Sequence, residues 1–389
     1  MLKKVLYISP NGYLGGAERF VLNACIGHKT IGKYQPVIVF LNDGELVNIV
    51  RELNIDHYVL KNTFKFKNTY ALFKAILEIS AFIKELRPNI IHSTMPYAHI
   101  FLSLLFLKEK FVKVWFQHGP VGGTLDKIAS LFRSDRIYFN SHYLQQVHHR
   151  TSWRNNTKNT DIIVNLGIDC DEVKAEESEK VRNLYLKNEQ ELLFITAGRI
   201  CEWKGYESLI IALQNLSLRK PELIKRIKLL IIGEAKSDRD KPYEEKLRKI
   251  SQDLIKNKTI EFIPFQKSLK PFYSAADVFF HTSTIAEPFG LVVAEAMAQG
   301  TLVVGGAVGG VCDILVDGKT GFSFNSHLES GVKELESIIE VKILNQNKTE
   351  KDILANNGKK LIIENYSIKA MVALLENDYD KLSSQNLSV

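Results

Sequence analysis

The chain has 389 residues, of which 45% are hydrophobic and 24% are charged, and its formal net charge is +7. This composition excludes a disordered or fibrous protein, and the length favours two domains over a single hydrophobic core. Four widely separated cysteines without a CxxC pair predict neither a disulfide framework nor a zinc knuckle. A reducing cytosol therefore fits best.

The charge is unevenly distributed along the chain. Residues 1–160 hold 21 lysines and arginines against 10 acidic residues, a balance of +11, whereas the remainder has a balance of −4. A basic half of this kind can face anionic lipid headgroups, phosphorylated substrates or nucleic acid. Within it, Lys61, Lys65 and Lys67 alternate with Phe64 and Phe66. That segment predicts either a membrane interface, with the rings dipping into lipid, or a solvated loop.

The N-terminus, MLKKVLYISPNGY, has too short an apolar run for a signal peptide and predicts a first β-strand. The most apolar stretch elsewhere is IFLSLLFL at 100–107, about eight residues against the roughly 20 that cross a bilayer. We expect a buried helix there, with membrane insertion as the alternative.

Short apolar runs rich in β-branched residues alternate with longer helical patterns. Residues 71–86, for example, repeat apolar residues at three- and four-residue spacing, as an amphipathic helix does. The alternation predicts an α/β fold with two Rossmann-like, doubly wound parallel sheets. The expected strands are 5–8, 36–41, 56–60, 89–92, 112–117, 136–140 and 161–164, then 192–198, 228–233, 259–263, 277–281 and 301–305.

A polar, turn-prone segment, NLGIDCDEV at 165–173, separates the two halves and leads into the charged residues 174–187. We expect an N-terminal domain over 1–166 and a C-terminal domain over 167–366. Because ligands bind outside the carboxyl ends of parallel strands, the active site is expected in a cleft between these domains.

The loop after the first strand, SPNGYLGGAER at 9–19, contains Gly15 and Gly16 just before a helix. Glycines without a β-carbon leave room for a ligand at the amide end of that helix. The spacing is not GxGxxG, and a glycine-rich first turn also serves packing alone. Both interpretations stay open at this loop.

His118 ends the fifth expected strand, immediately before a Gly-Pro turn. A histidine at this place points toward a ligand cleft, while the alternative is a buried histidine bonded to the backbone. His92, also at a strand end, competes for the same duty. Ser141 and His142 follow the sixth strand, where a helix cap is expected rather than a reactive group.

The loop GRICEWKG at 198–205 places Arg199 and Lys204 between a strand end and a helix start. A planar guanidinium and a compact ammonium together can neutralise a diphosphate leaving group. The alternative is a pair of exposed cations on a connecting loop.

The most informative segment is EPFGLVVAE at 287–295. Glu287 and Glu295 flank a Pro-Phe-Gly turn at the start of an apolar helix. The backbone amides of Phe289, Gly290 and Leu291 lie where a helix N-terminus attracts phosphate. Carboxylates that bind hydroxyls beside amides that bind an anion match the groups of a nucleotide sugar.

Several motifs, taken in order, resemble the retaining glycosyltransferases of family 4, which have the GT-B fold. They are GGAER at 15–19, HG at 118–119, NLGID at 165–169, GRICEWKG at 198–205, the paired glutamates at 287 and 295, and EAMAQG with VGGVCDILVDGKTGF at 308–322. The resemblance runs nearly end to end, and the glutamate pair is its hallmark.

The resemblance assigns a role to each matching position. It implies that Glu295 holds the ribose hydroxyls of the donor and that Glu287 lies near the hydroxyls of the donor sugar. Arg199 and Lys204 match the diphosphate clamp. The remaining matches are the phosphate and sugar contacts Phe289, Gly290 and Leu291, the N-terminal loop at Gly16 next to Gly15, the cleft histidine His118, and a last helix near 367–382 that packs back on the first domain.

The chain departs from the family pattern at three places. Thr301 stands where members often have proline, and Asp313 where they commonly have glutamate. The spacing from Ser283 to Glu287 is one residue longer than usual. These differences concern the shape of the donor-sugar pocket more than the reaction type.

A hydrolase pair fits the two glutamates less well than binding roles do. Eight helical residues span roughly 12 Å, whereas glycosidase carboxylates are about 5–5.5 Å or 6.5–9.5 Å apart. Metal dependence is not expected, because the Asp-x-Asp triplets at 169–171, 238–240 and 378–380 fall in a linker, a charged loop and a terminal helix.

The expected activity is a cytosolic, retaining, metal-independent transfer of a hexose from a UDP- or GDP-linked donor to an acceptor hydroxyl. A glycan or lipid-linked acceptor of bacterial surface polysaccharide or glycolipid synthesis, and peripheral contact of the basic domain with the membrane, are expected; a cofactor and nucleic acid are not. The alternatives are a nucleotide-sugar epimerase and a non-catalytic sugar-nucleotide-binding protein. A dinucleotide oxidoreductase lacks its fingerprint.

Overall fold

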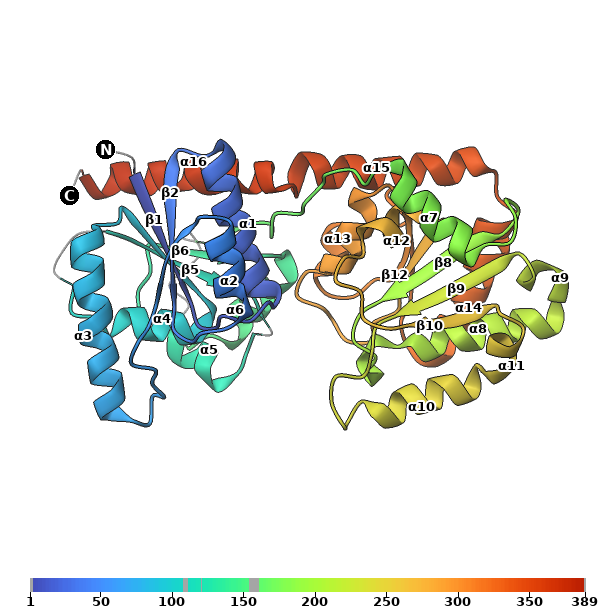
Figure 1. Ribbon diagram of the computed structural model, residues 1–389, viewed down its shortest axis with the longest axis horizontal. Coiled ribbons are helices and arrows are strands. Elements are labelled where there is room, and N and C mark those ends of the chain that lie inside the picture. Colours follow the sequence, from blue (N-terminus) through green and yellow to red (C-terminus); the bar gives the residue numbers. More distant parts are fainter. Residues whose placement is uncertain (1–2, 108–110, 120, 154–160, 388–389) are drawn as a thin grey trace. The chain divides into compact units, whose positions relative to one another are not determined.

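The computed structural model describes residues 3–107, 111–119, 121–153 and 161–387. The chain divides into two compact units, Met1–Gly167 with Asn365–Val389, and Ile168–Glu364. In Figure 1 the first is blue to teal with the terminal red helix α16, and the second runs from green through orange to the red helix α15.

The first unit is built on a seven-stranded sheet whose described strands are all parallel. Its spatial order is β3-β2-β1-β4-β5-β6-β7, so the strand order reverses between β1 and β4. Such a reversal is where open α/β sheets bind ligands. The strands are β1 (Lys3–Ser9), β2 (Tyr34–Phe40), β3 (Asp56–Val59), β4 (Ile90–Thr94), β5 (Val112–Gln117), β6 (Arg136–Phe139) and β7 (Asp161–Ile163).

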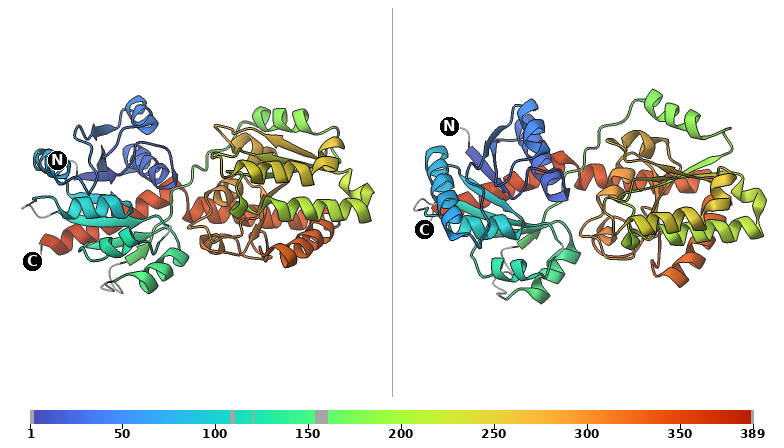
Figure 2. Two further views of the ribbon diagram at one scale, coloured as in Figure 1. Left: turned by 90° about the horizontal axis from the view of Figure 1, so that it is seen from below. Right: turned by 60° about the horizontal axis from the view of Figure 1, so that its bottom comes forward.

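Helices of this unit cover the sheet, as Figures 1 and 2 show. Residues 5–9 of β1 are buried without alternation, because a parallel strand is covered on both faces. The described helices are α1 (Gly16–Ile31), α2 (Glu45–Glu52), α3 (Thr69–Leu86), α4 (Met95–Ser103), α5 (Thr124–Ala129), α6 (His142–Thr151) and α16 (Ile368–Leu387).

The terminal helix α16 is fixed to this unit by buried polar contacts. Glu376 accepts hydrogen bonds from His28 Nδ1 at 2.8 Å and from the N–H of Lys33 at 2.8 Å. Asp378 forms a two-point ion pair with Arg136, at 2.9 and 2.8 Å. These contacts compensate carboxylates that would otherwise be costly to bury.

The second unit repeats the architecture with a six-stranded parallel sheet in its described residues, ordered β10-β9-β8-β11-β12-β13. Its strands are β8 (Leu192–Ala197), β9 (Ile227–Ile232), β10 (Ile260–Ile263), β11 (Val278–His281), β12 (Leu302–Gly306) and β13 (Phe322–Phe324). The core gathers strand residues such as Leu229 and Val304 with helix residues such as Leu209 and Leu335.

Helices again fill the connections of the second unit. The α-helices are α7 (Ala175–Tyr185), α8 (Tyr206–Arg219), α9 (Pro221–Ile224), α10 (Lys241–Ile250), α11 (Gln252–Lys256), α12 (Lys270–Ala275), α13 (Leu291–Ala298), α14 (Leu328–Ser337) and α15 (Lys348–Asn365). Shorter helical turns are η1 (Glu202–Lys204) and η2 (Gly310–Asp313), and a π-helical segment, η3 (Ile338–Leu344), continues α14.

The predicted α/β fold with two doubly wound parallel sheets is confirmed, and each expected strand is present within two residues of its ends. The sequence reading missed β13, because three residues are too few to show a periodicity. The amphipathic helix expected over 71–86 is α3, which begins two residues earlier after the N-cap Asn68. Ser141 caps α6 by accepting a hydrogen bond from the N–H of Leu144, as expected.

Two expectations for the first unit need correction. The helix expected over 100–107 ends at Ser103, and Phe106 beyond it is exposed. Phe64, expected to dip into lipid or lie in a solvated loop, is buried and stacks on Tyr97 and Phe101. Core burial of this large ring outweighs the interfacial position suggested by the neighbouring lysines. No helix in the described ranges is both long and apolar enough to cross a bilayer.

Candidate active site

The carboxyl ends of β8 and β11 are neighbours in the sheet, and the loops that follow these strands are in close contact. Gly205 ends η1 with φ of +64°, and a β-carbon there would come within 2.2 Å of the carbonyl oxygen of Thr282. Thr282 in turn donates from Oγ1 to the carbonyl of Lys204 at 2.8 Å. The glycine therefore lets the Lys204 loop approach the residues that follow β11.

Glu287 is the centre of a polar cluster at this edge. Its Oε1 atom receives Lys204 Nζ at 2.6 Å, His281 Nε2 at 2.9 Å and Ser283 Oγ at 2.6 Å. The Lys204 and Glu287 side chains are only 11% and 13% exposed. Three donors on one oxygen fix the carboxylate in one orientation.

The electrostatics of this cluster favour an ionised Glu287. Burial by itself would raise the pKa of the carboxyl group, but the hydrogen bond and charge of His281, together with the charge of Lys204, hold that pKa well below its ordinary value. Lys204 Nζ also lies 4.5 Å from the centre of the Trp203 ring, a favourable cation–π distance. The cluster is thus a compact pairing of a carboxylate with cationic groups.

The turn after Glu287 leads into α13 by way of Gly290, whose φ is +93°. The backbone of Glu287 is held by the N–H of Gly310, which donates to its carbonyl at 2.8 Å. A β-carbon on Gly310 would come within 2.1 Å of the Pro288 carbonyl, so the Val-Gly-Gly segment at 308–310 supports this turn through close backbone approach.

The amide end of α13 has backbone donors without an acceptor among the described residues. Among the described residues, the backbone N–H groups of Gly290 and Leu291 donate to no other group. Phe289 is buried and anchors the turn. Two unpaired amides at a helix N-terminus form a favourable environment for an anion.

Glu295 lies one turn into α13 and is half-buried. Tyr273 of α12 donates from its hydroxyl to Oε2 of Glu295 at 3.4 Å. Glu295 therefore belongs to the same helix as the open amides, but its carboxylate has a different neighbour from that of Glu287.

Arg199 has a different partner from Lys204. Its guanidinium pairs with Asp240 at 2.6 Å and donates to Ser237 Oγ at 3.3 Å, while 44% of its side chain remains exposed. The two cations expected to form one clamp thus come from the same loop but are held by different carboxylates. Glu287 holds Lys204, and Asp240 holds Arg199.

The candidate residues of the first unit lie after β1 and β5. Gly15 is the N-cap of α1 and Gly16 is its first residue. A carboxylate oxygen of the buried Glu18 lies 2.7 Å from the position that a β-carbon on Gly15 would take. His118 follows β5, and its ring stacks on Phe116 at a centroid distance of 4.0 Å.

The environment of His118 keeps the ring neutral. Burial lowers the pKa of His118 to about 3. Neither ring nitrogen has a hydrogen-bond partner among the described residues. A buried polar ring without a partner is uncommon in proteins and suits a group that awaits a ligand. His92 is different, because its Nδ1 binds the Tyr379 hydroxyl at 2.8 Å and so belongs to the attachment of α16.

Sequence reasoning missed His281 and Asp240 and used Ser283 only as a spacing marker. His281 ends β11 just as His118 follows β5, so the same rule about strand ends would have selected it. Nothing in the sequence pattern pairs Asp240 with Arg199, since 41 residues separate them.

The described residues contain no group of three His, Cys, Asp or Glu side chains able to hold a metal ion. Members of the three Asp-x-Asp triplets have other partners in the fold. Asp169 pairs with Lys270, Asp240 with Arg199 and Asp378 with Arg136.

Residues 177–361 match the model of the family described as glycosyl transferases group 1. Among curated proteins, a trehalose synthase of Thermococcus litoralis is 34% identical over 176 residues, which cover 44% of this chain and 40% of that protein. A D-inositol 3-phosphate glycosyltransferase of Corynebacterium aurimucosum is 34% identical over 132 residues, 33% of this chain and 30% of that protein. The matched region thus spans well under half of these relatives.

Solved structures match over nearly the whole chain. Anabaena HepE in complex with UDP superposes with a TM-score of 0.80 at 19% identity, covering 97% of this chain and all of that one. A glycosyltransferase from Rickettsia africae gives a TM-score of 0.83 at 18% identity, covering 98% of both chains. Residues 177–361 are thus similar to the group 1 glycosyl transferases, and the two parallel α/β sheets of the chain have the GT-B fold.

Proposed function

We propose that the chain is a retaining glycosyltransferase that moves a hexose from a nucleoside-diphosphate sugar to an acceptor hydroxyl. The observation that carries this proposal is the cluster at the edge of the second sheet. There Lys204, His281 and Ser283 converge on Glu287, close in the chain to the unpaired Gly290 and Leu291 amides of α13. Cations, amides and a fixed carboxylate are the groups needed to bind an activated sugar.

The donor is proposed to lie along α13 and the loop after β8. Glu295 binds the ribose hydroxyls, and Lys204 and Arg199 neutralise the diphosphate together with the amides of Phe289, Gly290 and Leu291. By the family resemblance, Gly15 and Gly16 are proposed to contact the phosphates as well. Glu287 binds a hydroxyl of the transferred sugar, and His118 lies beside that sugar.

To bind the diphosphate, Lys204 has to leave the Glu287 carboxylate and pair with the phosphate oxygens instead. In the structure its ammonium is paired with Glu287 at 2.6 Å. As Lys204 turns toward the diphosphate, His281 and Ser283 keep the Glu287 carboxylate in place. Preorganised positive charge then stabilises the leaving group as the bond between sugar and phosphate breaks, without a metal ion in the proposed mechanism.

UDP-glucose is the first donor to test, with GDP-linked sugars as the comparison. HepE, whose fold this chain shares, has been solved with UDP and with UDP-glucose. Of the residues proposed to contact the donor, Arg199, Lys204, Glu287 and Glu295 are in the region that matches the family model. A uridine donor is therefore the simplest specific proposal.

The acceptor is proposed to be a glycan or lipid-linked sugar of bacterial surface polysaccharide or glycolipid synthesis, met at the cytoplasmic face of the membrane. The first unit supports this with its excess of basic residues. On α3, Tyr70 and Phe73 are exposed, and they follow the exposed Lys65 and Lys67. Exposed rings beside lysines suit the interface of an anionic bilayer.

The test is a binding series followed by a transfer assay. We expect UDP and UDP-glucose to bind more tightly than ADP, and glucose to be transferred to a hydroxyl acceptor with its anomeric configuration kept. Replacing Lys204 with Ala is expected to lower kcat about a hundredfold or more. A Lys333→Ala variant, altered at an exposed lysine of α14, is the matched control. Full activity of Lys204→Ala with every donor, or isomerisation of the donor without an acceptor, would contradict the proposal.

A further inference from the structure

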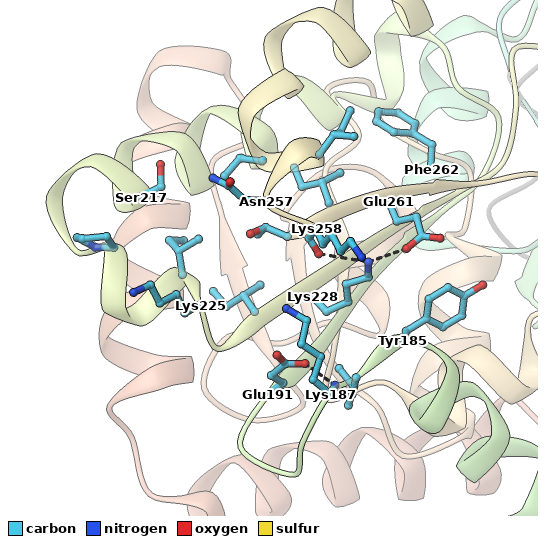
Figure 3. A pocket seen from close by; sticks show the side chains of 18 of the residues that line it. Tyr185, Lys187, Glu191, Ser217, Lys225, Lys228, Asn257, Lys258, Glu261 and Phe262 are labelled. Atoms are coloured by element: carbon cyan, nitrogen blue, oxygen red, sulfur yellow. Dashed lines mark hydrogen bonds and ion pairs between the residues drawn. The ribbon is translucent and has the colours of Figure 1, made fainter.

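A hollow of about 1070 Å³ lies at the amino ends of β8, β9 and β10, at the opposite end of these strands from the proposed donor site (Figure 3). Its walls come from the segment after α7, the starts of β9 and β10, and the helices α9 and α11. The volume is at the upper end of the range for small-molecule sites. No step of the proposed transfer uses it.

The floor and part of the rim of this hollow are apolar. Ile224, Ile227, Leu254 and Ile260 are buried beneath it. Leu184 stands at the rim with 73% of its surface exposed. A ligand that settles there gains by covering apolar surface.

The rim also carries a surplus of positive charge. Lys187, Lys225 and Lys258 are exposed and form no ion pair within the described residues. The carboxylates that line the hollow are already engaged: Glu261 pairs with Lys228 at 2.6 Å, and Glu191 accepts the N–H of Lys187 at 2.8 Å. Figure 3 labels Lys187, Lys225 and Lys258 among the side chains that line the hollow, with Lys228 bonded to Glu261 and to the Lys258 carbonyl. An anionic group at the rim would find three lysines that have no ion-pair partner among the described residues.

Lys258 occupies a backbone position that favours glycine. Its φ is +62°, and it follows α11 in a turn where its N–H donates to Ile255 and the N–H of Thr259 donates to Leu254. This is the helix-ending turn in which glycine is the usual residue at the left-handed position. A lysine stands here despite the conformational cost, and it is one of the residues that line the hollow.

We propose that this hollow binds a phosphate group carried on an apolar body, with Lys187, Lys225 and Lys258 around the phosphate and the apolar body over the isoleucines. Ammonium groups recognise phosphate as compact point charges, and the buried floor accounts for the apolar part. A phospholipid headgroup in a bilayer and a free phosphorylated amphiphile share this chemistry. The site does not depend on the proposed transferase activity.

The test measures binding of dodecyl phosphate, below its critical micelle concentration, and of inorganic phosphate to the full chain. A parallel arm measures association with vesicles of phosphatidylcholine containing phosphatidylglycerol. The variant carries Lys187→Glu, Lys225→Glu and Lys258→Glu. The matched control carries Lys333→Glu, Lys342→Glu and Lys348→Glu, three exposed lysines of the same unit that do not line the hollow.

We expect the hollow variant to weaken binding about tenfold or more, and the control to leave it nearly unchanged. Loss of dodecyl phosphate binding identifies a free amphiphile as the ligand, and loss confined to vesicles identifies a lipid headgroup. Leu184→Ser should weaken either interaction, while saturating UDP should not compete with it. Equal losses in both triple variants, equal affinity for inorganic and dodecyl phosphate, competition by UDP, or no effect of the hollow variant would overturn the proposal.

Discussion

Two tasks are proposed for the side chains around Glu287, namely holding its carboxylate and neutralising a bound ligand. Lys204 can leave Glu287 for an incoming anion only if other donors remain, and His281 and Ser283 are those donors. His281 is buried, and its second ring nitrogen, Nδ1, has no partner among the described residues. We therefore infer that His281 is a positioning residue for Glu287.

Replacing His281 with Leu removes a donor to Glu287 while keeping an apolar side chain. We predict that kcat falls roughly tenfold or more, since a hydrogen bond to a charged group contributes about 1.5–3 kcal/mol. The affinity for UDP should stay nearly the same, because Glu287 is proposed to contact the sugar and not the nucleotide. His281→Gln, which keeps an N–H donor, should recover part of kcat. Equal kcat values for the three proteins in a steady-state assay would contradict this role.

The ionisation of Glu287 links the same cluster to stability against acid. Its pKa in the folded chain is well below the value of about 4.3 for an unfolded glutamate, so ionised Glu287 stabilises the fold above that pH. This contribution disappears as the pH falls from about 4 toward the pKa in the folded chain. Denaturant unfolding at several pH values should show that Glu287→Gln loses less stability on acidification than the unmodified chain. Identical acid dependence would contradict the inferred charge state.

Among the elements, α16 is held to the first unit by a few carboxylates, and the Glu376 carboxylate is the one that receives the buried His28. Glu376 binds His28 and two backbone N–H groups of the β2 entrance. We predict that Glu376→Ala costs the first unit about 3 kcal/mol, because it leaves these donors unsatisfied. Hydrogen exchange should accelerate in α1 and α16 but not in β8 or β9, which serve as the internal control. Uniform or unchanged exchange would contradict this account.

The short helix α11 ends in a strained turn, which leads to a prediction of the opposite sign. Lys258→Gly should stabilise the second unit by about 1 kcal/mol, since glycine adopts φ of +62° without a steric penalty. Lys258→Ala, which keeps the penalty, is the matched control. Thermal unfolding that ranks the alanine variant at or above the glycine variant would show that the turn is not strained.

For the whole molecule, the sequence predicted the two sheets well because their strands are runs of buried Val, Ile and Leu separated by helical periodicity. It could not predict which candidate side chains meet. Lys204 and Glu287 are 83 residues apart and come together only because β8 and β11 are neighbours in the sheet. Asp240 as the partner of Arg199 depends in the same way on the position of the loop after β9.

The resemblance supplied roles that the residues alone left open. Arg199 and Lys204, read from their own spacing, could equally have been exposed cations, and His118 could have been a backbone-bonded core histidine. The structure leaves His118 without a polar partner among the described residues and pairs each of the two cations with its own carboxylate. The amino-acid sequence alone does not show which residues form such tertiary contacts.

The central claim is that the pyrophosphate of the donor binds between Lys204 and the amide end of α13. A crystal structure of the chain with UDP tests it most directly. The account predicts phosphate oxygens within hydrogen-bond distance of Lys204 Nζ and of the Gly290 and Leu291 amides, with the ribose on Glu295. UDP bound elsewhere, with Lys204 still paired to Glu287 and the α13 amides unoccupied, would contradict it.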